Sequence, residues 1–220
     1  MLHFSSLQGR RTARSCGLVG VVAAAALTLG GCGTSSGSRF ADSGATSTNG
    51  TTAPKLFGTA LPRTRAPSFT LRDQNGRRIS LTSERGSYVV VAFLYTHCPD
   101  VCPVIAAELN RALRELRSSR HVAKVLAVSV DPRGDTPRAV RSFVARHHLV
   151  PQFRYLTGSR RQLEHVWAAY NVASYPQGGE VVAHSATELL IDPQGFERAA
   201  YPSDVTAAHL VHDVRILEGT

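Results

Sequence analysis

"SYVVVAFLYTHCPDVCPVIAAELNRALREL", residues 87–116, carries the two signals that decide the fold of this chain. It begins with an almost unbroken run of apolar and β-branched side chains, which is typical of a strand buried on both faces of a parallel sheet. Apolar residues then recur at helical spacing from Val101 to Leu116. The stretch therefore predicts a central strand that runs directly into a helix. Cys98 should lie at the junction, and Cys102 about one turn into the helix.

The flanking sequence predicts the rest of an α/β domain. A hairpin is expected over residues 67–81, because two alternating runs flank Asn75-Gly76. A helix over residues 135–149 should begin with Thr136 as its N-cap and Pro137 at its first position. The remaining predicted elements are strands at 122–130 and 153–158, a helix at 159–172, a hairpin at 186–202, and a closing helix at 203–219 capped by Ser203 and ended by Gly219. This order predicts an α/β fold with a central mixed sheet flanked by helices.

The N-terminus has the pattern of an export signal. Arg10, Arg11 and Arg14 precede the apolar run "CGLVGVVAAAALTLGG" at residues 16–31. The sequence Leu-Gly-Gly-Cys that ends at Cys32 resembles the lipobox of bacterial lipoproteins. That resemblance implies cleavage before Cys32 and attachment of lipid to it. The alternatives are an ordinary signal peptide and an uncleaved anchor helix.

Three segments follow from these patterns. We expect residues 1–31 to be a lipoprotein signal peptide and residues 56–220 to be the folded, monomeric domain. Residues 32–55 between them consist mostly of Gly, Ser, Thr and Ala, which cannot bury enough apolar area to fold. A coil of that length spans roughly 26 Å. The domain should therefore be held at the extracytoplasmic side of a cell membrane, facing a periplasm or the cell exterior.

The composition narrows the function classes. The net charge is +9, but the arginines are scattered rather than clustered in one stretch, which argues against nucleic-acid binding. A basic surface that faces anionic lipid or an acidic partner fits the charge equally well. The hydrophobic fraction of 43% is enough for a real core.

The cysteines point to chemistry rather than to a structural disulfide. Cys16 would leave with the signal and Cys32 would carry lipid, so only Cys98 and Cys102 would remain as thiols. A bridge between them would close a tiny loop and restrain the unfolded chain little. A helix N-terminus stabilises a thiolate, so the pKa of Cys98 should be lowered. Spacing of four residues places both sulfurs on one helix face, where they could hold a soft metal such as Cu(I) or zinc, or form an easily reduced disulfide.

Two thiolates rarely complete a metal site, so a histidine is the next candidate. His184 follows a Gly-rich stretch and directly precedes a predicted strand, from where a loop can reach over the sheet. His97 should point away from Cys98 if it ends the central strand. The other histidines of the mature chain fall on helices or their ends among polar residues, and we expect them on the surface: His121, His147, His148, His165, His209 and His212.

Four segments, in order, resemble the Sco/SenC family, thioredoxin-fold copper proteins that help assemble cytochrome c oxidase. They are "PSFTLRDQNGRRISL", "VVVAFLYTHCPDVCP", "AVSVDPRGDTP" and "HSATELLIDPQG". The resemblance implies a thioredoxin-like fold with an N-terminal β-hairpin and an inserted hairpin. It also implies copper, as Cu(I) or Cu(II), bound by Cys98, Cys102 and His184. The implied partner is the copper-binding subunit of cytochrome c oxidase or another cuproprotein.

The resemblance leaves two activities open. The protein is expected to be a copper metallochaperone or a thiol–disulfide oxidoreductase that reduces the cysteines of the oxidase subunit through a redox-active Cys98–Cys102 pair. A peroxiredoxin is disfavoured because Tyr95 stands where a threonine is needed. A general thioredoxin-like reductase is disfavoured because residues 185–187 lack a proline. An inactive structural module is disfavoured because all three implied ligands are present.

Three further residues bear on the implied site. The family often has aspartate before the histidine ligand, where this chain has Ala183. Because metal-bound histidines usually need an acceptor for their second nitrogen, this departure puts affinity in doubt more than ligand identity. Asp131 and Asp135 match family elements, and we expect them to serve turn and cap chemistry rather than partner docking.

Overall fold

The computed structural model describes residues 55–177, 180–183 and 187–219. Cys32 and His184 lie outside the described residues, as do the predicted signal peptide and nearly all of the predicted tether. No described helix is both long enough and apolar enough to cross a membrane.

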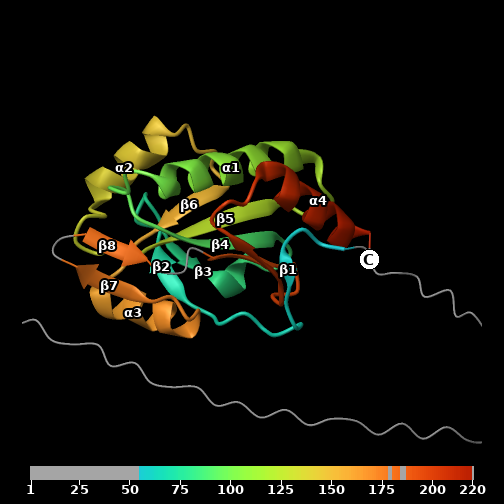
Figure 1. The fold of residues 1–220 in the computed structure, drawn as a ribbon, viewed down its shortest axis with the longest axis horizontal. Coiled ribbons are helices and arrows are strands. Elements are labelled where there is room, and N and C mark those ends of the chain that lie inside the picture. Colours follow the sequence, from blue (N-terminus) through green and yellow to red (C-terminus); the bar gives the residue numbers. More distant parts are fainter. Residues whose placement is uncertain (1–54, 178–179, 184–186, 220) are drawn as a thin grey trace, which may run out of the picture. The chain divides into compact units, whose positions relative to one another are not determined.

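A mixed six-stranded sheet forms the centre of the domain, as predicted (Figure 1). Strand β4 pairs in parallel with β5, and β5 with β6, while β9 pairs antiparallel with both β4 and β10. The short β1 adds to the outer edge of β10. The strands, in spatial order, are β1 (Thr59–Ala60), β10 (Glu197–Pro202), β9 (Thr187–Ile191), β4 (Tyr88–Leu94), β5 (Ala123–Ser129) and β6 (Phe153–Leu156).

Two small hairpins stand apart from this sheet. The predicted N-terminal hairpin consists of β2 (Thr70–Arg72) and β3 (Arg78–Ser80). Its turn is closed by Asp73, whose Oδ1 accepts hydrogen bonds from the backbone N–H groups of two turn residues at 2.9 Å each. The second hairpin, β7 (Ser174–Gln177) and β8 (Glu180–Ala183), lies in a stretch where we predicted no strand.

Four α-helices cover the sheet: α1 (Val101–Glu115), α2 (Pro137–Arg146), α3 (Arg160–Ala169) and α4 (Ala207–Glu218). Helices α1, α2 and α4 pack on one face, and α3 packs on the other together with the β2–β3 hairpin. Figure 1 shows α1 and α4 on the opposite side of the sheet from α3. Short 3₁₀ turns, η1 (Leu81–Glu84) and η2 (Leu116–Ser118), follow β3 and α1.

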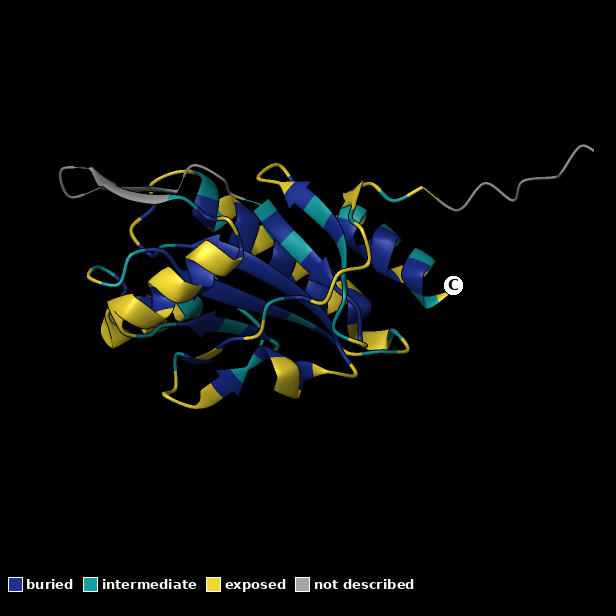
Figure 2. Ribbon diagram, turned by 90° about the horizontal axis from the view of Figure 1, so that it is seen from below, coloured by how far each residue is buried: buried dark blue, intermediate teal, exposed yellow. Residues whose placement is uncertain are grey.

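Strand β4 explains why its sequence is apolar without alternation. All of its residues are buried, and successive side chains enter different cores. Val90, Ala92 and Leu94 pack in the cluster beneath α1 and α4, whereas the intervening residues pack toward α3. Figure 2 shows the buried strands enclosed by helices whose outer faces are exposed. The strand therefore ends in a rigid, doubly packed position just before the cysteines.

The helix boundaries confirm most of the predicted caps. The Thr136 side chain accepts a hydrogen bond from the backbone N–H of Ala139 at 3.2 Å, and Pro137 opens α2. The prediction that Ser203 caps α4 is wrong. Thr206 is the N-cap and accepts from the backbone N–H of His209 at 3.3 Å, because the preceding turn buries Val205 against the core. Gly219 ends the helix as predicted.

Candidate metal centre

The two cysteines lie at the junction between β4 and α1. Cys98 is in the loop, and Cys102 is the second residue of α1, so it lies within the first helical turn rather than a full turn inside. Both side chains are buried, and both are free thiols. The junction predicted for Cys98 is confirmed.

The Cys98 sulfur takes part in capping α1. The backbone N–H of Cys102 donates to Cys98 Sγ at 3.3 Å, while the N-cap residue Asp100 forms no side-chain cap hydrogen bond. The first N–H groups of a helix have no partner within the helix, so an acceptor placed there is stabilising. The sulfur of Cys98 thus lies at the positive end of the helix dipole, where a thiolate is favoured.

The environments of the two thiols drive their pKa values apart. Burial alone would raise the pKa of Cys98. Hydrogen bonds to its sulfur, first from the Cys102 side chain and then from the backbone N–H groups of Asp100 and Cys102, outweigh burial and lower that pKa. Burial raises the pKa of Cys102, and the interaction with Cys98 raises it further. Of the two thiols, Cys98 is therefore the one that loses its proton more readily, and Cys102 the one that keeps it.

A buried carboxylate fixes the loop that carries Cys98. Asp135 Oδ1 accepts from the backbone N–H and the hydroxyl of Thr96, at 2.8 and 2.7 Å. Asp135 Oδ2 accepts from the hydroxyls of Ser129 and Tyr155, at 2.5 and 3.0 Å. One side chain thereby ties the end of β4 to β5 and β6. The position of Cys98 follows from this tie.

The structure separates the roles of the two aspartates. Asp131 serves turn chemistry as predicted, since its Oδ1 accepts from the backbone N–H groups of Arg133 and Gly134. Asp135 serves neither turn nor cap, because its carboxylate is buried among hydroxyls and Thr136 supplies the cap. The sequence shows that Ser129 ends the apolar strand β5 and that Thr96 follows β4, but it does not indicate which carboxylate these two hydroxyls contact.

A cleft of about 650 Å³ opens beside Cys98. His97 lines it too, with Nδ1 3.1 Å from Thr96 Oγ1, so the expectation that His97 points away from Cys98 is wrong. That expectation assumed that His97 ends the strand, whereas β4 ends at Leu94. Three exposed arginines from the α2 side also line the cleft: Arg133, Arg138 and Arg146.

The described residues do not assemble a complete metal site. Within residues 55–177, 180–183 and 187–219, no three side chains of His, Cys, Asp or Glu gather closely enough to hold a metal ion. The structure thus brings together Cys98 and Cys102, and the predicted third ligand, His184, stays a prediction. The loop's chemistry is nevertheless that of a soft-metal or disulfide site, with two thiols in one buried position.

Comparison with known proteins shows which family this chain resembles. The SCO1/SenC family model matches residues 59–217. The SCO1 protein homolog of Bacillus subtilis (strain 168) is 28% identical over 131 residues, which cover 58% of this chain and 68% of that protein. The mitochondrial SCO2 homolog of Bos taurus is 32% identical over 154 residues, which cover 67% of this chain but only 57% of the bovine protein.

A solved structure agrees with the fold. The crystal structure of Arabidopsis thaliana ScoI with copper bound superposes with a TM-score of 0.64 at 26% identity, covering 71% of this chain and all of that one. The thioredoxin-like Sco fold predicted from the sequence, with a mixed sheet flanked by helices and an added small hairpin, is therefore confirmed.

Proposed function

Because this chain belongs to the SCO1/SenC family, we propose that it is a membrane-tethered copper metallochaperone that assists assembly of the copper centre of cytochrome c oxidase. The observation that carries the proposal is the pair of unbridged, buried thiols at the start of α1. Copper is present in the related Arabidopsis structure and in a related ScoI structure from Bradyrhizobium japonicum. Thiolates are the ligands that Cu(I) prefers.

The proposed ligands are Cys98, Cys102 and His184. Support for the histidine comes from the topology. Strand β9 begins at Thr187 and runs antiparallel to β4, with Leu189 opposite Val91. The start of β9 therefore lies beside the end of β4, which is the end that leads to the cysteines. A ligand placed just before β9 in the sequence suits a site at this edge of the sheet.

The proposed copper acceptor is the copper-binding subunit of the oxidase or another cuproprotein. The cleft beside Cys98 suits an acidic partner surface, since none of its three arginines forms an ion pair with another described residue. Opposite charges steer association of the partners and orient them. The site for metal transfer would then adjoin the surface that receives the partner.

The proposed location rests on the N-terminal sequence. Lipid on Cys32 would hold residues 56–220 close to the outer surface of the cell membrane, and the stretch over residues 32–55 would let the domain reach its partner. A Cys32→Ser variant should either be released from the membrane or fail to be processed. Normal processing with unchanged retention after washing without detergent would contradict the lipid anchor.

A thiol–disulfide oxidoreductase is the second candidate, favoured by the divergent pKa values of the two thiols. The Cys98 thiolate would attack a partner disulfide and release one partner thiolate. Cys102 would then attack the mixed disulfide, which releases the second. The partner gains two electrons and two protons in total, and this chain is left with a Cys98–Cys102 disulfide. An external dithiol would have to reduce that disulfide before the next turnover.

Copper titration of the reduced full-length protein tests the metal site. We expect one copper per chain. Cys98→Ala and Cys102→Ala should each abolish tight binding of Cu(I) and Cu(II). His184→Ala should weaken Cu(II) more than Cu(I), because two thiolates can hold Cu(I) alone. A thiolate-to-Cu(II) absorption band that persists in the double cysteine variant would contradict the ligand assignment.

The His184→Ala variant also separates the two candidate functions, since it keeps both thiols. Cells that carry it should assemble oxidase poorly at low copper and recover when copper is added. If they assemble active oxidase as well as wild type at low copper, thiol chemistry is the essential function. Assembly that fails even with added copper, while the variant protein is folded and abundant, would contradict a role for copper supply alone.

A further inference from the structure

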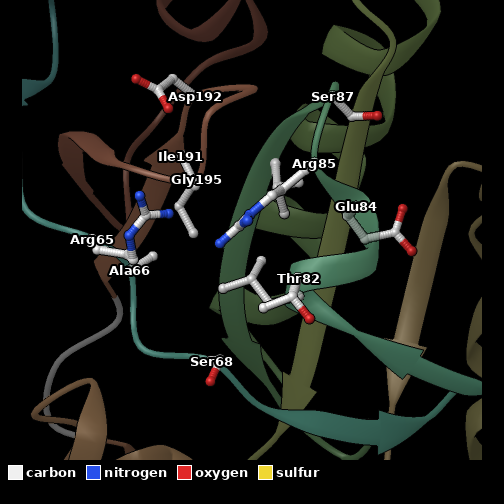
Figure 3. A pocket seen from close by; sticks show the side chains of 12 residues that line it. Arg65, Ala66, Ser68, Thr82, Glu84, Arg85, Ser87, Ile191, Asp192 and Gly195 are labelled. Carbon is white, nitrogen blue, oxygen red and sulfur yellow. The ribbon is translucent and has the colours of Figure 1, made fainter.

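A second pocket lies at the other end of β4 from the cysteines (Figure 3). Its volume is about 380 Å³, and its apolar wall includes Leu81, Val89 and Ile191. Val89 is near the start of β4, whereas Cys98 follows its end, so a strand's length of roughly 20 Å separates the two sites. The pocket is therefore not an extension of the thiol site.

Two guanidinium groups converge in this pocket. Arg65 comes from the segment before β2, and Arg85 follows η1. Both approach the same point above Gly195: a side-chain carbon there would lie 3.5 Å from Arg85 Nε and 3.7 Å from Arg65 Nη1. Figure 3 shows the two guanidinium groups directed toward each other across the pocket. Glycine at position 195 leaves the space beside them open.

The carboxylates of the pocket already have other partners. Glu84 pairs with Lys124 at 2.5 Å, and in Figure 3 its carboxylate points away from the guanidinium groups. Asp192 pairs with Arg198 at 3.3 Å and accepts hydrogen bonds from backbone N–H groups of its own turn. Among the described residues, Arg65 and Arg85 form no ion pair. Two guanidinium groups in the pocket thus have no ion-pair partner among the described residues, although the lining also holds two carboxylates that are paired with other cations.

Arg65 is held in place for an incoming anion. Its guanidinium lies 4.5 Å from the centre of the Phe196 ring, and its Nη1 donates to the backbone oxygen of Gln194 at 3.4 Å. Arg63 stacks on the same ring at 4.3 Å, and its Nε lies 3.9 Å from the carboxylate of Asp192, so its charge is already paired. A side chain fixed before binding loses less entropy when the ligand arrives. Two like charges so close repel each other, and a bound anion would remove that repulsion.

We propose that Arg65 and Arg85 form a binding site for a phosphate group. Each guanidinium presents a planar fork of N–H donors that matches two oxygens of one phosphate, so two facing forks can hold a single phosphate from both sides. The phosphate can be free inorganic phosphate or the phosphate of an anionic lipid headgroup, because both offer the same oxygens. The site is independent of copper and of the proposed function.

Titration of the full-length protein in neutral detergent with inorganic phosphate tests the site. Binding should be saturable by calorimetry and should raise the unfolding temperature, as any ligand that prefers the folded state does. Arg65→Gln and Arg85→Gln should each weaken binding roughly tenfold or more, since each removes charge-assisted hydrogen bonds. Arg141→Gln, an exposed arginine on α2 outside the pocket, should leave binding unchanged.

The lysine variants keep the test decisive if a glutamine variant unfolds. Arg65→Lys and Arg85→Lys retain the charge but lose the fork, so they should bind phosphate more weakly than wild type and more tightly than the glutamine variants. Copper titration should be the same in all of these proteins. Absence of phosphate binding by wild type, or wild-type binding by the Arg65→Gln/Arg85→Gln double variant, would overturn the proposal.

A second titration identifies the source of the phosphate. Phosphatidylglycerol is added to the micelles, with phosphatidylcholine as the matched neutral lipid, and inorganic phosphate binding is measured again. Competition by phosphatidylglycerol alone would identify a lipid headgroup as the ligand. Unchanged phosphate binding in both lipids would identify free phosphate. Both results support the two-arginine site, and only the origin of its ligand differs between them.

Discussion

Two carboxyl groups on opposite sides of β4 are buried away from water, but they are stabilised in different ways. Asp135, beside β5 and β6, accepts four hydrogen bonds from Thr96, Ser129 and Tyr155. Glu188, on β9, is fully buried, and neither of its oxygens has a hydrogen-bond partner among the described residues. Burying a charged group is costly unless other groups replace the lost water.

Glu188 is therefore protonated in the folded protein below about pH 8. Burial raises its pKa from the ordinary 4.5 to about 8. Burial also raises the pKa of Asp135, but the donors around that carboxylate oppose the shift. Donors let Asp135 act as a tie at the thiol site, whereas Glu188 is accommodated by staying neutral. Asp135 therefore stabilises the structure, whereas Glu188 destabilises it as the pH rises and the carboxyl group ionises.

The largest effect should come from Asp135→Ala. The change removes the acceptor of the backbone N–H of Thr96 and of the three hydroxyls of Thr96, Ser129 and Tyr155, which should destabilise the protein by about 4 kcal/mol. The loop that carries Cys98 should also shift, so copper affinity should fall in whatever fraction stays folded. Urea unfolding and copper titration measure the two effects. Asp135→Asn keeps the shape and should cost less, and equal losses in both variants would mean that the acceptor oxygens are not the source.

The second-largest effect should come from replacing Glu188, and this change should stabilise the protein by an amount that depends on pH. Because the folded-state pKa of Glu188 lies above its ordinary value, the folded protein binds the proton more tightly than the unfolded chain. Stability should fall as the pH rises from about 4.5 to about 8. Glu188→Met removes this penalty, so its gain over wild type should be about 3 kcal/mol larger at pH 8 than at pH 5.

Glu188→Gln is the matched control for that change. It keeps a buried polar group but cannot ionise, so it should lose the pH dependence and stabilise less than Glu188→Met. Thermal unfolding across the pH range measures both variants. A gain that does not change with pH would show that Glu188 has a partner that holds its charge.

The smallest effect should come from Thr96→Val. This change removes one of the four donors to Asp135 and leaves the backbone N–H of Thr96 in place. A single hydrogen bond from a neutral donor to a buried carboxylate is worth about 2 kcal/mol. Urea unfolding should show that loss with an unchanged dependence on denaturant. A loss as large as that of Asp135→Ala would mean that the hydroxyl, rather than the carboxylate, organises the loop.

Periodicity predicted the sheet and helices well because packing repeats along the chain. The apolar run at β4 and the helical spacing in α1 placed Cys98 at their junction, and Thr136-Pro137 marked the start of α2. Local sequence alone predicted Ser203 as the N-cap of α4. Thr206 is the N-cap instead, because Val205 packs in the core. Local signals decide a helix start only where tertiary packing allows it.

The environment of the thiols could not be predicted in the same way. The tie through Asp135 joins residues from three strands, and no sequence period links Thr96, Ser129 and Tyr155. The isolation of Glu188 was equally hidden, because its place between Thr187 and Leu189 on β9 gives no hint of whether donors reach it. Such features depend on long-range neighbours, which a single sequence does not specify.

The strand order of the sheet also has a consequence for how the chain is made. During synthesis, β4, β5 and β6 can pair once residue 156 has emerged, but the other edge of β4 waits for β9, which ends at Ile191. At typical elongation rates this delay lasts a few seconds. For that time a valine-rich strand presents an open edge, the kind of surface on which chains aggregate. The edge of β4 is therefore the part of the unfinished sheet at which incomplete chains are most prone to aggregate.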